Sequence, residues 1–408
     1  MKKGKILIND ILFIGILLIG SYVDNMLIYL LCCIFILLNI MKTKKIKSNY
    51  LYILLLGIGI FSSLIHFNSL TIRNIVRDFY YFSVGFVFIL SGYYIGYSLK
   101  NKKMLIRDLY YFIFLKVLIN LLKVFGNIAL GKVAINFQSI RDVCGLDTEL
   151  VATSLAIIIT FSNNEMLKIF NKKKIRIIIL FETIALLCSF SRTGYTIFII
   201  MLIVLNFKSI KKFQIRKINK CFCVLLIITF IICIMPKSFT QPFINKFKKS
   251  ASEISSSNKW NNTTIIQNWR GYELYEAKIT YKNSTILEKI FGSGFGKLIR
   301  VKNSELVGIA SSEGGITILH NGYAMLLIKT GIIGTLMFLL WLFQYFYKGF
   351  VNKKNVYSRI LISLIVSIIF DTYVVSGLFK AAVSFGFTVS IGIVIAMHEI
   401  KNIELKVG

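Results

Sequence analysis

Proline, histidine and acidic residues are scarce in this chain of 408 residues. It holds two prolines, three histidines, and 18 aspartates and glutamates against 49 lysines and arginines. The sequence contains no D-x-D motif, no H-E-x-x-H motif and no clustered pair of carboxylates. These absences argue against a metal site of the common kinds and against the carboxylate pair of a glycoside hydrolase. We therefore expect a protein that works without a cofactor.

Paired cysteines are also lacking. Seven cysteines are present, but only Cys144 falls in a predicted outer loop, where it has no partner. The other six lie in or beside apolar segments: Cys32, Cys33, Cys188, Cys221, Cys223 and Cys233. This distribution excludes a disulfide framework and a structural zinc site.

Apolar residues dominate the chain. Hydrophobic residues make up 56% of it, which is typical of an integral membrane protein. The formal net charge of +31 could indicate binding to nucleic acid, but the lysines lie in short clusters between apolar runs. The sequence also lacks the interleaved aromatic and basic residues of a nucleic-acid-binding surface. The positive charge therefore indicates a membrane protein and no nucleic-acid partner.

The apolar segments are numerous enough for about twelve transmembrane helices. They fall near residues 6–21, 26–41, 50–67, 78–98, 104–125, 150–163, 175–190, 194–207, 221–236, 320–347, 357–370 and 378–397. We therefore predict an all-α, polytopic membrane protein. We interpret the first segment as a membrane span and not as a cleaved signal peptide.

Lysine clusters predict the orientation. With the N-terminus inside the cell, the clusters at 42–47, 100–103, 168–176, 208–220 and 348–359 all become cytoplasmic. The opposite short loops carry few basic residues, as the positive-inside rule requires. Both termini are then cytoplasmic, in the cell membrane, and the long polar region at 237–319 faces outward.

The long polar region divides the chain into three parts. We expect an N-terminal bundle of about nine helices at 1–236, a large extracytoplasmic loop at 237–319, and C-terminal helices at 320–408. Both prolines, Pro236 and Pro242, stand where the bundle would end. Within the loop, the sequence WRGYELYEAKITYKN predicts a helix, and IFGSGFGKLI predicts a glycine-rich turn.

His320 and Asn321 stand at the junction between this loop and a long apolar segment. A histidine there could act in catalysis, or it could simply end a helix at the membrane interface. Lys329 falls on the opposite side of the expected helix and is not grouped with His320.

Arginines at the predicted outer surface break the usual charge bias and call for an explanation. Arginine binds phosphate through two parallel hydrogen bonds, so several arginines around an outer cavity favour a diphosphate ligand. The alternative is that they contact lipid headgroups, or that Arg270 pairs with Glu273 three residues on. The outward polar groups are Arg73, Arg77, Arg141, Arg192, Arg270, His320 and Asp371.

Two further patterns are candidate substrate contacts. Gly294 and Gly296, in the segment Gly292–Gly296, could cradle a phosphate, but glycines more often mark a turn. Lys116, Asn120 and Lys123 fall on one face of an apolar segment, and charges inside a membrane usually face the bundle interior. We predict a polar wall there; a bundle ion pair for Lys116 and a lipid-facing Lys123 are the alternative.

Three motifs resemble those of the O-antigen ligase/polymerase superfamily. They are SFSRTGYTIFII, WRGYELYEAKITYKNSTILEKIFGSGFG and LHNGYAMLLIKTGIIGTLMFLL, and they occur in the family's order and topology. One departure is Tyr275, where the family often has tryptophan. The resemblance implies a GT-C-like membrane glycosyltransferase that acts on the outer face.

The resemblance also implies roles for individual residues. Arg192 and Arg270 would bind the diphosphate of a polyprenyl-diphosphate-linked glycan, and His320 would act on the acceptor hydroxyl. Asn321 and Tyr323 belong to the same motif and would contact substrate. Positively charged side chains can stabilise a leaving diphosphate, and a neutral histidine is a plausible general base.

The expected function is polymerisation of a surface polysaccharide of capsule or O-antigen type. Its partners would be lipid-linked donor and acceptor glycans, the bilayer, a flippase and a chain-length regulator. A ligase that moves the finished glycan to another acceptor shares the motifs. A transporter or flippase of lipid-linked glycan, and a non-catalytic scaffold, are alternatives of a different class.

Overall fold

The computed structural model shows a helical protein. It describes residues 8–43, 49–99, 101–134, 136–145, 147–162, 166, 169–211, 241, 244–245, 260–301, 315–352 and 355–407. Within these ranges no strand forms, and an isolated antiparallel bridge pairs Ile299 with Ile316. The all-α prediction is confirmed. The predicted span at 221–236 lies outside the described residues.

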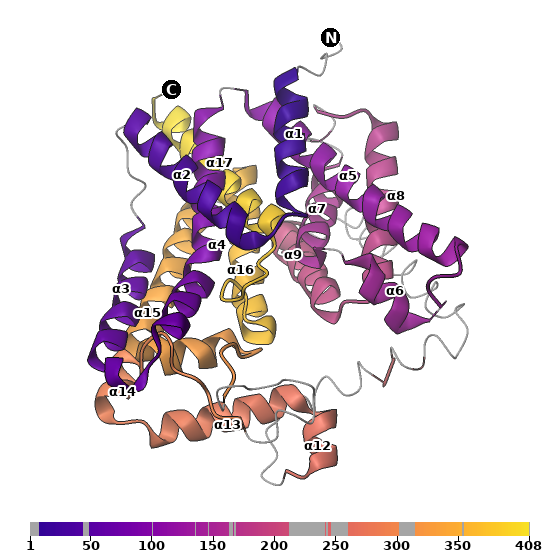
Figure 1. Ribbon diagram of the computed structural model, residues 1–408. Coiled ribbons are helices and arrows are strands. Elements are labelled where there is room, and N and C mark those ends of the chain that lie inside the picture. Colours follow the sequence, from indigo (N-terminus) through magenta and orange to yellow (C-terminus); the bar gives the residue numbers. More distant parts are fainter. Residues whose placement is uncertain are drawn as a thin grey trace.

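The helices follow the predicted apolar runs closely (Figure 1). Their bounds are α1 Ile8–Gly20, α2 Asn25–Thr43, α3 Tyr50–Ile65, α4 Ile72–Ser98, α5 Lys102–Ala129, α6 Phe137–Cys144, α7 Thr148–Phe161, α8 Lys172–Ser189, α9 Arg192–Lys211, α12 Asn262–Gln267, α13 Trp269–Asn283, α14 Ile286–Phe291, α15 Gly322–Val351, α16 Val356–Val375 and α17 Phe385–Val407. A short 3-10 helix spans Phe67–Ser69.

Five of the described helices, α2, α4, α5, α15 and α16, are long and apolar enough to cross a membrane. The bent pair α6 and α7, with 82° between them, would make a sixth span. The chain is therefore a polytopic membrane protein by the length and composition of its helices. The number twelve, the orientation and the three-part division remain predictions.

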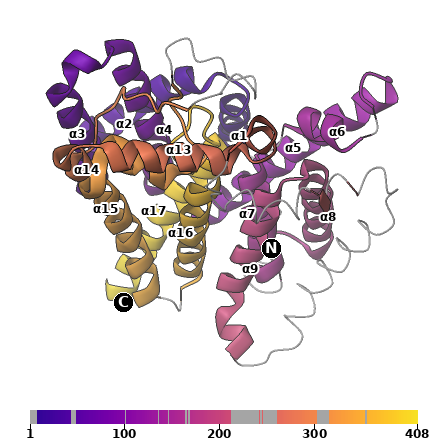
Figure 2. The ribbon, with the colours of Figure 1, turned by 90° about the horizontal axis from the view of Figure 1, so that it is seen from below.

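The helices gather in two groups. α2, α3, α4 and α15 lie on one side, α5 to α9 lie on the other, and α16 and α17 lie between them (Figures 1 and 2). α4 and α17 approach closely because glycines face each other. A Cβ at Gly92 would lie 2.1 Å from the carbonyl oxygen of Val389, and one at Gly392 would lie 1.9 Å from that of Ile89. Small residues allow this close packing of membrane helices.

Some boundaries differ from the prediction. Arg73 and Arg77 were expected in a loop, but they lie in the first turns of α4. The last helix begins at Phe385 and not at 378, because left-handed backbone at Ser376 and Gly377 interrupts the chain before it. α6 lies in a stretch where no helix was predicted.

The long helix α15 is broken at Gly331, whose φ of 65° and ψ of −168° are not helical. The break frees carbonyl groups, and the glycine-rich turn after α14 occupies the gap. The N–H of Ser293 donates to the carbonyl of Ile328 at 2.8 Å, and the N–H of Gly294 donates to that of Lys329 at 3.1 Å. Unbonded backbone groups are costly in a membrane, so the turn satisfies what the break exposes.

Helix α14 is tied to the same turn by Glu288. Its carboxylate accepts hydrogen bonds from the N–H of Thr285 at 2.8 Å and from the hydroxyl of Ser293 at 3.1 Å. Partial burial would raise the pKa of Glu288, but these hydrogen bonds outweigh burial and lower it. An ionised Glu288 thus caps α14 and holds the turn.

Replacing Gly331 by alanine should destabilise the protein. A Cβ there would lie 2.3 Å from the carbonyl oxygen of Ile290, in a conformation that L residues rarely adopt. Such strain costs about 1–3 kcal/mol before any clash is counted. We expect a lower melting temperature of the purified protein in detergent. Gly126→Ala is the matched control, because nothing lies within 4 Å of its added Cβ. Equal melting temperatures for the two variants would contradict this reading of the break.

Candidate active site

His320 and Glu273 are in direct contact. The His320 ring nitrogen Nδ1 lies 2.8 Å from Oε2 of Glu273, and the His320 N–H donates to the same oxygen at 3.1 Å. The Glu273 side chain is 3% exposed, whereas that of His320 is 40% exposed. Because a carboxylate only accepts hydrogen bonds, Nδ1 carries a proton, and in the neutral form of the ring Nε2 has the lone pair. The pair therefore presents a basic nitrogen on the accessible side of the ring.

The backbone around His320 is fixed from a second side. The N–H of Ser376 donates to the carbonyl of His320 at 2.7 Å, and the Ser376 hydroxyl donates to the carbonyl of Leu319 at 2.5 Å. Ser376 adopts a φ of 63°, which aims both groups at this segment. His320 is thus held between α13 and the end of α16 before α15 begins at Gly322.

Glu273 is supplied by α13, which crosses the end of the bundle (Figures 1 and 2). This confirms the helix predicted from WRGYELYEAKITYKN. Aromatic side chains pack beside it: the ring centroids of Trp260 and Tyr272 are 5.1 Å apart, and those of Trp269 and Tyr272 are 6.0 Å apart. Arg270 lies one turn before Glu273 on α13.

Arg192 begins α9 directly after a two-residue turn that follows α8. The turn needs left-handed backbone at Phe190, with a φ of 45°, and the Ser191 hydroxyl accepts a hydrogen bond from the N–H of Gly194 at 3.1 Å. A Cβ on Gly194 would lie 3.1 Å from Thr148, so Arg192 starts its helix beside the start of α7. The short gap between the predicted apolar segments 175–190 and 194–207 is thus a tight turn.

An ion pair connects the start of α7, beside Arg192, with the segment 376–384, which contacts His320. Glu149, in the first turn of α7, lies 3.5 Å from the Lys380 ammonium. Lys380 follows Ser376, whose N–H holds His320. Asp371, on α16, is buried. Arg192 and His320 therefore lie at the same end of the bundle, joined through α7 and the 376–384 segment.

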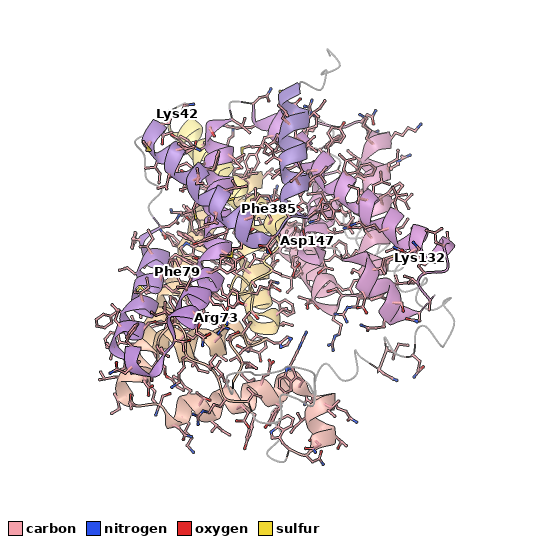
Figure 3. All side chains as sticks on the ribbon, viewed as in Figure 1. Lys42, Arg73, Phe79, Lys132, Asp147 and Phe385 are labelled. Atoms are coloured by element: carbon pink, nitrogen blue, oxygen red, sulfur yellow. The ribbon has the colours of Figure 1, made fainter. Side chains whose placement is uncertain are left out.

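Arg73 and Arg77 lie on α4 at this end of the bundle, where Figure 3 labels Arg73. Two guanidinium nitrogens of Arg77, Nε and Nη2, are buried and have no hydrogen-bond partner among the described residues. Buried donors normally have a partner, so these two nitrogens are unsatisfied within the part of the chain that the structure describes; binding of substrate by Arg77 remains a prediction. Its neighbour Asp78 is already engaged with the Lys329 ammonium, which is 0% exposed.

Gly294 and Gly296 have structural partners. Gly294 donates to the carbonyl of Lys329, and the N–H of Gly296 donates to Oδ2 of Asp78 at 2.6 Å. Both glycines have positive φ, 88° and 93°, and pack against α3 and α4. These contacts assign the glycine-rich segment to docking of the loop; its contact with substrate remains a prediction.

Lys116 and Lys123 lie on one face of α5, as the spacing predicted, and they contact different groups. Lys116 is buried and pairs with Asp147, which Figure 3 labels. Lys123 is exposed, with its ammonium 4.7 Å from the centre of the Tyr22 ring. The Tyr22 hydroxyl donates to Asn120 at 3.2 Å, so a polar face exists there. Its role toward substrate remains a prediction.

Asn321 and Tyr323 flank the start of α15. Asn321 caps the helix, because its side-chain oxygen accepts the N–H of Ala324 at 2.9 Å. The Tyr323 hydroxyl donates to the carbonyl of Ile369 at 3.2 Å. Both residues thus position the helix that follows His320.

Two pairs of residues far apart in the sequence were not predicted. Glu273 was interpreted only as a partner of Arg270, and Lys329 was set aside because it lies away from His320. The contact of Glu273 with His320 joins positions 47 apart, and that of Asp78 with Lys329 joins positions 251 apart. One feature of the sequence could have predicted the pairing of Lys329. A lysine in the middle of an apolar span requires a buried partner of opposite charge.

A model of the O-antigen ligase family matches residues 177–339, from α8 to α15. The matched range contains Arg192, Arg270, Glu273 and His320. No curated protein matches the chain. Among the described residues, no group of three histidine, cysteine or acidic side chains could hold a metal ion. The family indicates a glycan transfer of ligase or polymerase type, with lipid-linked glycan substrates in a membrane. This match over residues 177–339 supports a relationship of the chain to the O-antigen ligase/polymerase superfamily.

Proposed function

We propose that this protein polymerises a surface polysaccharide by joining lipid-linked glycans at the outer face of the cell membrane. The observation that carries the proposal is the contact between exposed His320 and buried Glu273 at the end of the bundle. A histidine held by a carboxylate is a general base whose second nitrogen faces its substrate.

The proposed reaction is a direct displacement. A hydroxyl of the acceptor glycan attacks the anomeric carbon of the donor, and its proton passes to Nε2 of His320. The new C–O bond forms as the bond from that carbon to the diphosphate oxygen breaks, and the diphosphate leaves with the electron pair. Glu273 keeps the ring in the correct tautomer and stabilises the imidazolium that forms.

Arginines balance the charge of the leaving diphosphate. Arg192 starts α9, Arg270 stands one turn from Glu273, and Arg77 has buried donors without a partner among the described residues. We assign these three, with Arg73, to the diphosphate. Guanidinium groups aimed at developing charge in a water-poor site supply the stabilisation that a divalent cation gives in other transferases.

The remaining predicted contacts complete the proposed site. Lys116, Lys123, Asn321 and Tyr323 would line the approach of the glycans. The lysine clusters support cytoplasmic termini. They also support an outward-facing site, because α13 lies within the long polar region at 237–319, which the positive-inside rule does not restrict, and His320 follows it directly. A flippase would deliver the substrates, and a chain-length regulator would act on the product.

A ligase is the second candidate, because the matching family is described as O-antigen ligase. The ligase would move a finished glycan from the same diphosphate lipid to another acceptor. The His320–Glu273 pair serves both reactions, because each needs an acceptor hydroxyl deprotonated and a diphosphate released. A transporter is disfavoured, because its site would lie near the membrane midplane and not beside a surface helix.

The first test compares surface glycan in a deletion strain that carries the wild-type protein or His320→Ala at matched membrane levels. We expect long chains with the wild type and single repeat units with the variant. Long chains left on carrier lipid in the variant would instead support the ligase. His66→Ala is the matched control; its ring contacts the Ser62 carbonyl at 2.9 Å, and it should leave the chains unchanged. Normal attached polymer with His320→Ala would contradict a catalytic role.

Glu273→Gln in the same assay separates positioning from folding. An amide cannot stabilise an imidazolium as a carboxylate does, so we expect the rate to fall about a hundredfold or more with little change in KM for the donor. Glu276→Gln is the control, since Glu276 lies on the same helix and interacts with Tyr272. Equal effects of both variants would show that the contact with His320 is structural.

Arg192→Lys and Arg270→Lys should each slow transfer. Lysine keeps the charge but loses the two parallel hydrogen bonds, and losing one such donor typically costs a factor of about 100–1,000 in rate. Arg176→Lys is the control, because Arg176 lies near the start of α8, whereas Arg192 follows the end of that helix. The measurement is the initial rate of glycan transfer at saturating donor. Unchanged rates in both test variants would remove these arginines from the reacting centre.

A further inference from the structure

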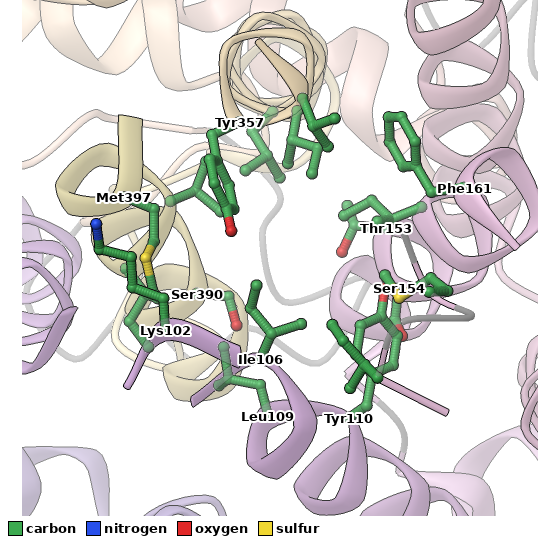
Figure 4. A pocket seen from close by; sticks show the side chains of 18 of the residues that line it. Lys102, Ile106, Leu109, Tyr110, Thr153, Ser154, Phe161, Tyr357, Ser390 and Met397 are labelled. Carbon is green, nitrogen blue, oxygen red and sulfur yellow. The ribbon is translucent and has the colours of Figure 1, made fainter. Parts of the chain in front are cut away.

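A cavity of about 680 Å³ lies between α5, α7, α16 and α17 (Figure 4). Asn355 and Tyr357, at the start of α16, line it, whereas Ser376, which holds His320, follows the other end of the same helix. A helix of 20 residues is roughly 30 Å long. The end of the cavity at Asn355 and Tyr357 is therefore far from His320, whereas Leu150, in the first turn of α7, lines its other end.

The wall of the cavity is suited to hydrocarbon. Much of it is aliphatic, contributed by Leu150, Ile157, Leu364 and other side chains. Three of its hydroxyl groups are already bonded inside the protein. Those of Thr153 and Ser390 donate to backbone carbonyls at 2.9 and 2.7 Å, and that of Ser154 donates to Glu182 at 2.7 Å. A polar occupant would find few free partners at these hydroxyls. At the start of α16, Nδ2 of Asn355 is buried and has no hydrogen-bond partner among the described residues.

The rim of the cavity is positively charged. Lys102 and Lys103, in the first turn of α5, and Lys401, near the end of α17, all line it. The N-termini of α5 and α16 add positive partial charge at the same rim. The nearby acidic residue Glu399 accepts a hydrogen bond from Tyr93 at 3.0 Å and lies 3.8 Å from Lys348. The charge of the rim thus complements an anion at the mouth of an apolar cavity.

We propose that this cavity binds an anionic phospholipid, with an acyl chain inside it and the phosphate on Lys102, Lys103 and Lys401. The volume is in the usual range for ligand pockets. Basic pockets between membrane helices on the cytoplasmic side are suited to such headgroups, and the lysine clusters predict that side here. The lipid fills the space between the two groups of helices and joins them. The proposed phosphate site lies at the end of α16 away from His320.

The test is a binding titration of the full-length protein in detergent. Phosphatidylglycerol and phosphatidylcholine with identical acyl chains are compared. We expect saturable binding of phosphatidylglycerol and much weaker binding of phosphatidylcholine. Lys102→Gln/Lys103→Gln should weaken phosphatidylglycerol binding roughly fivefold per lysine, or about thirtyfold in all. Lys42→Gln is the control, because Lys42 is in the last turn of α2 and does not line the cavity. Equal binding of both lipids, or an unaffected double variant, would overturn the proposal.

A second measurement identifies what occupies the cavity in the membrane. A photo-cross-linking amino acid at position 157 should form an adduct with phospholipid in cells. An adduct with residues 212–240 of the chain itself would show that the cavity is filled by the protein and would overturn the proposal. A polyprenyl-phosphate adduct, or no adduct at all, would overturn it as well.

Discussion

The structure depends on how helices α13 and α14 and the turn after them are joined to the long helices at the break in α15. A helix interrupted at Gly331 leaves carbonyl groups of Ile328 and Lys329 without helical partners, and the turn at Ser293 and Gly294 supplies the missing donors. A side chain of α4 strengthens the same junction. The Asp78 carboxylate accepts a hydrogen bond from the N–H of Gly296 and pairs with the buried ammonium of Lys329. Breaking such a buried pair by removing one partner typically costs about 3–5 kcal/mol. The turn is therefore anchored to α4 and α15, and α13 is positioned from there.

This anchoring gives the chemistry its geometry. Glu273 is buried and belongs to α13, whereas His320 is more exposed and directly precedes α15. The two side chains meet only when α13 and α15 are packed together. The contact exists because α13 is docked across the end of the bundle (Figure 2). In the proposed reaction, a base fixed by a buried carboxylate and by Ser376 would need little reorganisation during transfer. Specificity for a polymerising or a ligating acceptor would then reside in the surroundings of the pair and not in the pair itself.

Much of the fold could be predicted from the sequence. Inside a membrane, the backbone of a long apolar run must satisfy its own hydrogen bonds, and a helix does this within one segment. The helix Trp269–Asn283, the turn before Arg192 and the placement of His320 at a junction were visible in local patterns. The partner of His320 was not, because spacing reveals neighbours on one helix and not contacts 47 positions apart. Likewise, the segment around Gly331 had the composition of a continuous helix with small residues. The break is stabilised by hydrogen bonds from the turn at Ser293 and Gly294, which lies outside the helix. The sequence around Gly331 alone therefore does not predict the break.

The central claim is that the chain itself elongates lipid-linked glycan. The most direct measurement mixes the purified protein, in detergent, with lipid-linked repeat units as both donor and acceptor, and resolves the products by length. The account predicts a ladder of products, with release of polyprenyl diphosphate for every bond formed and no growth with the His320→Ala protein. Products no longer than the starting repeat unit with the wild-type protein would contradict it.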